Sequence, residues 1–156
     1  MKNLKFKTIT IFLLLFSLFL VRDTLAYTVI AVEEETIFYG ATDGPHVKEK
    51  GLYKYYFQID EKKNTVKRVK IVALGNNAPI LLKKGDIIPD DTIYQIILPQ
   101  QKSILTGKKT IHAIGQPGVR STELLTITDS YVMFSKSTGD YMVISRSKII
   151  ETSDIK

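Results

Sequence analysis

The chain of 156 residues contains no cysteine. Disulfide bonds, zinc–thiolate sites and cysteine nucleophiles are therefore excluded, and no thiol is present to carry a lipid anchor. Small domains that are exported to an oxidising compartment often depend on disulfide bonds. A chain of this length can instead bury enough apolar surface to be stable on its own core.

Histidine is also scarce, with only His46 and His112 in the chain. A metal site needs three or four converging ligands, and the spacing of these two residues does not indicate that they meet. We expect His46 in a surface loop over residues 41–51 and His112 on the outward side of a strand. The two histidines therefore give no reason to expect a metal ion. Glycine-rich phosphate loops are also absent, so no cofactor is expected.

Two short matches and one acidic run could suggest hydrolytic chemistry. Residues 145–148 match Ser-x-x-Lys and residues 136–139 are similar to a Lys-Thr-Gly element, but both lie in a predicted β-meander, whereas that serine belongs at the start of a helix. Residues 33–35, three consecutive glutamates, could supply a general acid and base. Adjacent carboxylates are more typical of a solvated strand end, so we assign no catalytic residue.

The N-terminal segment has the three-part pattern of a secretory signal peptide. A basic start is followed by an apolar run over residues 9–21, and then by the small residues Thr24 and Ala26. The run is shorter than the roughly 20 residues that a spanning helix needs. We therefore predict cleavage between Ala26 and Tyr27, with an uncleaved N-terminal anchor as the alternative.

Cleavage would leave residues 27–156 as a single exported domain, periplasmic or secreted, without a membrane span. About half of the formal charge of +6 belongs to residues 1–26, which hold four basic residues and one acidic residue. The basic composition therefore does not indicate a nucleic-acid-binding protein.

Beyond residue 26 the sequence predicts about eight to ten short strands and no helix. The clearest pattern covers residues 123–150, where β-branched and aromatic runs separated by short turns predict a three-stranded antiparallel meander. Residues 27–40 read as one strand that continues across a bend, or as two strands. Residues 41–51 and 99–109 are expected to be loops. The fold class is therefore all-β, a small antiparallel β-sandwich or β-barrel.

Alternation along the strands predicts which side chains face a core, because successive side chains point to opposite faces. In the meander, Val132 and Phe134 form the more apolar face of the second strand, and Met142 and Ile144 form that of the third. A long hairpin is expected over residues 52–74. Its first strand has an apolar face formed by Tyr53, Tyr55, Phe57 and Ile59.

The return strand of this hairpin should set Val69, Ile71 and Ala73 against a wet face that includes Arg68 and Lys70. Basic residues beside tyrosines can bind single-stranded nucleic acid. The basic residues of this stretch are Lys62, Lys63, Lys67, Arg68 and Lys70, beside Tyr53, Tyr55 and Tyr56. Neighbouring acidic residues dilute the stretch, which favours an ordinary solvated hairpin face.

These observations favour an exported, non-catalytic binding or interaction module whose loops carry the function on a β scaffold. One alternative is a carrier barrel with an apolar cavity, and another is a small hydrolase that depends on carboxylates or on a histidine beside an acidic residue. The expected partner is an envelope or extracellular protein, a glycan or an apolar small molecule, and not nucleic acid. No motif is specific enough to name a family.

Overall fold

A computed structural model of the chain describes residues 26–40, 45–48, 51–75, 82–102, 109–118 and 120–155. These ranges contain ten strands and no helix. The strands are β1 (Ala26–Gly40), β2 (Pro45–Lys48), β3 (Tyr53–Asp60), β4 (Thr65–Ala73), β5 (Ile87–Pro89), β6 (Ile93–Lys102), β7 (Lys109–Gly118), β8 (Ser121–Ile127), β9 (Tyr131–Ser137) and β10 (Tyr141–Asp154). No helix among these residues is long and apolar enough to cross a membrane.

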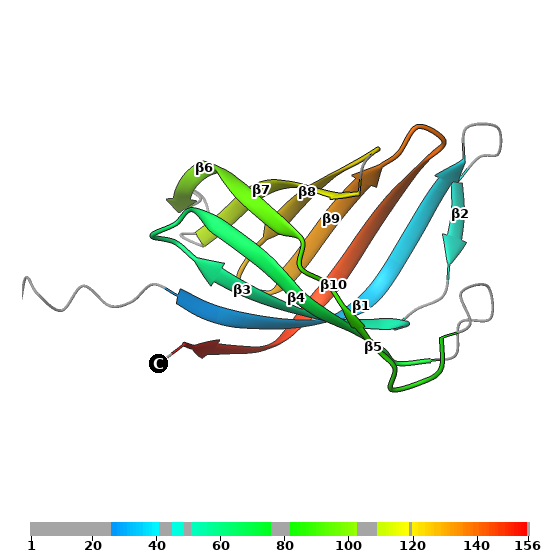
Figure 1. The fold of residues 1–156 in the computed structure, drawn as a ribbon, viewed down its shortest axis with the longest axis horizontal. Coiled ribbons are helices and arrows are strands. Elements are labelled where there is room, and N and C mark those ends of the chain that lie inside the picture. Colours follow the sequence, from blue (N-terminus) through cyan, green and yellow to red (C-terminus); the bar gives the residue numbers. More distant parts are fainter. Residues whose placement is uncertain are drawn as a thin grey trace, which may run out of the picture.

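Eight of the strands form a closed antiparallel barrel in the order β1, β3, β4, β6, β7, β8, β9, β10. The barrel closes where β10 pairs with β1, so the first and last strands lie side by side (Figure 1). Strand β2 pairs with the end of β1, and β5 pairs with the end of β4. The all-β prediction is confirmed, and of its two alternatives the fold is the barrel.

The predicted meander is confirmed as β8, β9 and β10, which pair antiparallel in sequence order. Both of its turns contain a threonine whose hydroxyl accepts backbone hydrogen bonds. Thr128 Oγ1 accepts from the amide of Tyr131 at 3.0 Å, and Thr138 Oγ1 accepts from the amide of Tyr141 at 3.2 Å. Such side-chain bonds stabilise short turns between strands.

Two of the predicted loops contain strand. Residues 45–48 form β2 against β1, and the segment 99–109 includes the end of β6 and the start of β7. In both segments the backbone pairs with a neighbouring strand. Such pairing uses backbone hydrogen bonds, so polar side chains do not prevent it. Strand β1 is a single strand through the glutamate run, with irregular register between Ile30 and Ala31 and between Glu33 and Glu35.

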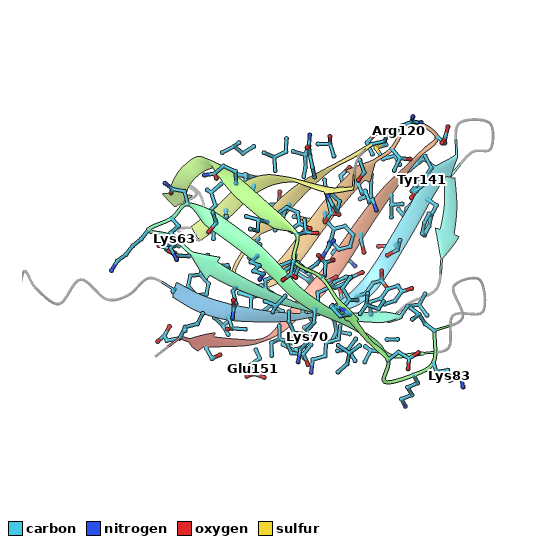
Figure 2. All side chains as sticks on the ribbon, viewed as in Figure 1. Lys63, Lys70, Lys83, Arg120, Tyr141 and Glu151 are labelled. Carbon is cyan, nitrogen blue, oxygen red and sulfur yellow. The ribbon has the colours of Figure 1, made fainter. Side chains whose placement is uncertain are left out.

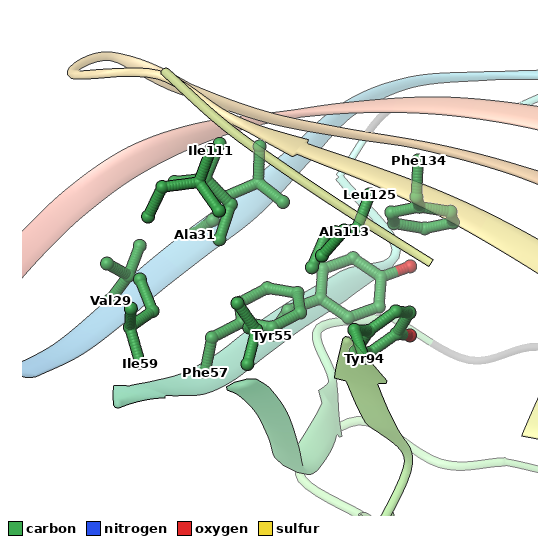
Figure 3. Packing of buried hydrophobic residues seen from close by; sticks show 13 residues of the cluster. Val29, Ala31, Tyr55, Phe57, Ile59, Tyr94, Ile111, Ala113, Leu125 and Phe134 are labelled. Atoms are coloured by element: carbon green, nitrogen blue, oxygen red, sulfur yellow. The ribbon is translucent and has the colours of Figure 1, made fainter. Parts of the chain in front are cut away.

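The barrel interior is filled with aromatic and aliphatic side chains from all sides of the wall (Figure 3). Phe134 is buried as predicted, and its ring packs edge-on against Tyr55 with the centroids 5.3 Å apart. The predicted apolar face of β3 also points inward, with Tyr55, Phe57 and Ile59 buried. By contrast, Lys63 in the β3–β4 turn projects away from the barrel (Figure 2).

The predicted inward face of β10 is wrong, because Met142 and Ile144 are exposed. The buried face carries Val143, Ser145 and Ser147 instead. Ser145 lies opposite Phe134 in the register with β9. Residues directly opposite each other in an antiparallel pair share a face, so the inward Phe134 places Ser145 inside as well.

The predicted wet face of β4 is also wrong at Arg68, whose side chain is buried. The register between β3 and β4 shifts by one residue at this point, so that Tyr56 pairs with Lys70 while Phe57 pairs with Arg68. Val69 is the extra residue of this β-bulge, and a bulge exchanges inward and outward positions along a strand. Before the bulge Arg68 faces inward, and after it Ile71 and Ala73 do.

Candidate functional site

Four side chains form a buried ionic cluster that we call the Arg68 cluster: Arg68, Asp90, Tyr94 and Glu123. Arg68 Nη1 donates to Glu123 Oε1 at 2.7 Å, and Arg68 Nε donates to Asp90 Oδ2 at 2.7 Å. The hydroxyl of Tyr94 donates to the same oxygen of Glu123 at 2.6 Å. The cluster thus joins β4, β6, β8 and the segment between β5 and β6.

Within this cluster, the folded protein favours the charged forms of Arg68 and Asp90. Burial opposes the charge of Arg68, but Glu123, Tyr94 and Asp90 outweigh it and raise the pKa of the guanidinium. Burial also opposes ionisation of Asp90, yet hydrogen bonds from Thr92 and the charge of Arg68 lower its pKa. Burial raises the pKa of Tyr94, so its hydroxyl stays protonated as a donor.

Gly115 makes room for this cluster on the neighbouring strand. A Cβ atom at this position would lie 2.7 Å from Cδ1 of Tyr94 and 3.1 Å from the carbonyl oxygen of Ile93. The first distance is shorter than real Cβ contacts, and the second is tight. A side chain at residue 115 would therefore require the Tyr94 ring to move from the position in which its hydroxyl reaches Glu123.

A second polar cluster, which we call the Glu33 cluster, consists of Glu33, Thr36, Ser145 and Ser147 on β1 and β10. The hydroxyl of Thr36 donates to Glu33 Oε1, and Ser145 Oγ lies 3.2 Å from the same oxygen and 2.7 Å from Thr36 Oγ1. The amide of Leu52 donates to Glu33 Oε2 at 3.2 Å. Glu33 is only 4 % exposed, so the prediction of a solvated strand end is wrong for this residue.

Two features leave the Glu33 cluster incomplete. No basic side chain pairs with Glu33 among the residues that the structure describes. The hydroxyl of Ser147 is fully buried and has no hydrogen-bond partner within the same residues. Ser147 lies directly opposite Glu33 in the register of β1 with β10, so both side chains share the inward face.

A surface pocket of ≈ 470 Å³ adjoins this cluster. Among the described residues, those that line it are Glu33, Glu34, Glu35, Gly51 and Arg146, so Glu33 is the member of the Glu33 cluster that the pocket reaches. Arg146 Nε lies 3.5 Å from Glu34 Oε2, and Arg146 Nη2 lies 3.8 Å from Glu35 Oε2, on a side chain that is half exposed. Ion pairs of this length on the surface contribute little stability. The described residues of the lining, three carboxylates and one guanidinium, carry a net negative charge.

Tyr55 lies within electrostatic reach of both clusters. Burial and then the charge of Glu33 raise the pKa of its hydroxyl, Arg68 opposes this, and Glu123 adds to it. The Tyr55 hydroxyl is therefore neutral, and charges of both clusters influence its pKa. Its ring packs against Phe134.

The structure does not bring the histidines into an acidic cluster within the described residues. His112 points outward from β7 as predicted, and its Nδ1 lies 3.1 Å from Thr126 Oγ1. His46 lies in β2 and not in a loop, and its side chain is outside the described part of the chain. The described residues also contain no group of three or more His, Cys, Asp or Glu side chains that could hold a metal ion. Ser145 and Lys148 lie on opposite faces of β10.

The predicted basic stretch is dispersed over the barrel. Arg68 is inside, Lys63 pairs with Asp60 at 3.0 Å, and Lys67 pairs with Asp91 at 2.7 Å. Lys54 and Lys70 lie over the outward ring of Tyr56, at 5.4 and 4.2 Å from its centroid.

Ala26 and Tyr27, the predicted cleavage junction, are the first two residues of β1. The carbonyl of Ala26 accepts from the amide of Ile155 at 3.0 Å. Burial and the nearby Glu61 raise the pKa of Tyr27 to about 12. Residues 1–25 lie outside the described ranges, so the signal peptide stays a prediction.

The residue pattern did not indicate that Arg68 and Tyr94 both bond to Glu123. For Glu123 the signal was present, because Leu125 and Ile127 follow it at a spacing of two and share its buried face. Comparison of the chain with protein-family models, with curated proteins and with solved structures found no match.

Proposed function

We propose that the chain is an exported, non-catalytic binding protein that holds a small polar ligand at the Glu33 cluster, beside the pocket in the β1 wall. The observation that carries the proposal is the unpartnered hydroxyl of Ser147, buried opposite a carboxylate without a basic partner among the described residues. Buried polar groups are nearly always satisfied, so a ligand that bonds to both groups would complete the cluster.

The position of the ligand follows from the contrast with the rest of the interior. Tyr55, Phe57, Tyr94 and Phe134 occupy the barrel (Figure 3), as expected for an eight-stranded barrel whose interior is just wide enough for side chains. This supports a polar site at the wall over an apolar cavity. The hydrolase alternative lacks support from His112, which contacts Thr126.

Native mass spectrometry tests the binding proposal. The protein should be purified without denaturant from its own compartment, after expression from the full-length coding sequence. We expect an added mass that disappears on unfolding and that is absent from Glu33→Gln purified in the same way. A bare mass for the wild type, even after incubation with an extract of that compartment, would contradict the proposal.

The same spectra test export. Cleavage between Ala26 and Tyr27 predicts a polypeptide mass that corresponds to residues 27–156. A mass that includes residues 1–26 would support the uncleaved anchor instead.

A further inference from the structure

We infer that the ligand of the Glu33 cluster carries a primary ammonium group, which binds between the carboxylate of Glu33 and the hydroxyl of Ser147. This inference rests on the proposed function and names the class of ligand: a small organic cation.

The charge of Glu33 favours a cationic ligand. Glu33 accepts hydrogen bonds from Thr36, Ser145 and the amide of Leu52, but these donors are neutral. A buried carboxylate is costly unless a cation pairs with it. Among the described residues, the adjoining pocket adds the carboxylates of Glu34 and Glu35, and Arg146 is the one basic residue of its lining. A ligand with a positive charge is therefore attracted to the pocket and compensates Glu33.

The hydrogen-bond acceptors of Glu33 and Ser147 favour an ammonium group. A carboxylate has about four acceptor positions and a serine hydroxyl has two. Glu33 Oε2 accepts one bond, from Leu52, among the described residues, and Ser147 Oγ accepts none. The two groups thus offer unused acceptor positions on the same inward face. An ammonium group has three donors and no acceptor, and it is compact, so it matches this arrangement.

The side chains at the cluster and the volume of the pocket favour a small organic cation over a metal ion. The described residues offer no group of three acidic, histidine or cysteine ligands for a metal ion, and the remaining donors at Glu33 are neutral hydroxyls. The pocket volume of ≈ 470 Å³ lies in the range of about 300–1,000 Å³ that is typical of small-molecule sites. The ammonium would occupy the cluster beside Glu33, the residue that the cluster and the pocket share, and the rest of the molecule would lie in the pocket.

Amide NMR titration of the protein with n-butylammonium, at low ionic strength, tests the inference. Sodium butyrate and n-butanol serve as probes of the same chain length without the positive charge. We expect n-butylammonium to shift the amides around Glu33, Leu52 and Ser147, and butyrate to leave them unchanged. Equal shifts with n-butanol, or no shift with n-butylammonium at the highest concentration, would overturn the inference.

Variants locate the charge. We expect Glu33→Gln to weaken n-butylammonium binding by at least about tenfold, because a buried charge pair is lost. Glu151→Gln is the matched control, because Glu151 is an exposed carboxylate of β10 that is not among the residues lining the pocket; it should weaken binding by less than about threefold, since exposed charges are screened. If Glu33→Gln does not fold, as judged by circular dichroism, Ser147→Ala carries the test and should also weaken binding. Unchanged affinity in the folded variant would overturn the inference.

An amine of the chain itself is the competing occupant. Lys48 and Lys50 precede Gly51 in the sequence, and their side chains lie outside the described residues. Binding of n-butylammonium only after both lysines are replaced by alanine would assign the site to the chain's own amine and overturn the inference. A neutral or anionic ligand in the native mass spectra would also overturn it, while the proposed binding function would stand.

Discussion

The two buried polar clusters of this barrel differ in how completely their groups are paired. In the Arg68 cluster, a cation contacts two carboxylates, and a tyrosine hydroxyl bonds to one of them. In the Glu33 cluster, neutral hydroxyls surround a carboxylate, and one hydroxyl has no partner among the described residues.

The complete Arg68 cluster is expected to stabilise the fold, whereas the incomplete Glu33 cluster is the proposed ligand site. A buried network in which every member is satisfied holds strands in one arrangement. The proposed function assigns the incomplete Glu33 cluster to a group from outside the chain. Four substitutions test this difference, and their expected effect on stability decreases from Glu123→Ala to Ser147→Ala.

The largest effect is expected for Glu123→Ala. This change leaves Arg68 buried with Asp90 as its remaining carboxylate, and removing one partner of a buried ion pair costs about 3–5 kcal/mol. Urea denaturation would measure the loss in free energy of unfolding. The exposed pair of Lys63 and Asp60 is the control, and Lys63→Ala should leave the free energy of unfolding close to that of the wild type. A similar small loss for both variants would show that the Arg68 cluster does not stabilise the barrel.

Gly115→Ala should be the next most destabilising change. The added methyl group meets the Tyr94 ring and the Ile93 carbonyl, and overpacking of this kind costs about 1–3 kcal/mol. The matched control is Gly139→Ala, since a Cβ at Gly139 would have no atom within 4 Å. A thermal melt in which both variants match the wild type would mean that Tyr94 can move without leaving Glu123.

Asp90 gives the Arg68 cluster a defined pH dependence. Its pKa is lowered in the folded state, so its contribution to stability is fully present above the unfolded pKa of about 3.9 and is lost as the pH falls through the lower folded value. Asp90→Asn should flatten the dependence of urea stability on pH below about pH 4. An unchanged slope in this variant would contradict the pairing of Asp90 with Arg68.

The smallest effect on stability is expected for Ser147→Ala. Removing an unpartnered buried hydroxyl should leave the free energy of unfolding unchanged or raise it by up to about 1 kcal/mol. Ser145→Ala on the same strand removes a bonded hydroxyl and should lower stability by about 0.5–1.5 kcal/mol. If Ser147→Ala, measured without ligand, is the more destabilising of the two, the hydroxyl of Ser147 has a partner within the chain.

The strands and several inward faces followed from residue alternation alone. Val132, Phe134, Tyr55 and Phe57 lie where period-two patterning and side-chain size place them. The same reasoning failed on β10, where the more apolar residues Met142 and Ile144 face outward. There the register with β9 decides the face, and register depends on pairing between strands that hydropathy along one strand does not contain.

The candidate site was missed for a related reason. Arg68 faces inward because of a bulge at Val69, and Glu33 lies beside a register shift in β1. Bulges invert the alternation that sequence reasoning uses. The sequence did single out the glutamates at 33–35, but it could not separate the buried Glu33 from Glu34 and Glu35. That separation depends on contacts with Ser145, which is 112 residues away in the chain.

The closure of the barrel between its first and last strands sets an order of assembly. During folding, the edge of β1 that pairs with β10 has no partner until residues 141–154 join the sheet. Contacts across so long a sequence separation form late, because the entropy of closing the chain must be overcome first. The half of the Glu33 cluster that β10 supplies arrives with this last strand. Until β10 pairs with β1, the other strands form an open sheet that lacks half of the candidate site, so closing the wall also completes that site.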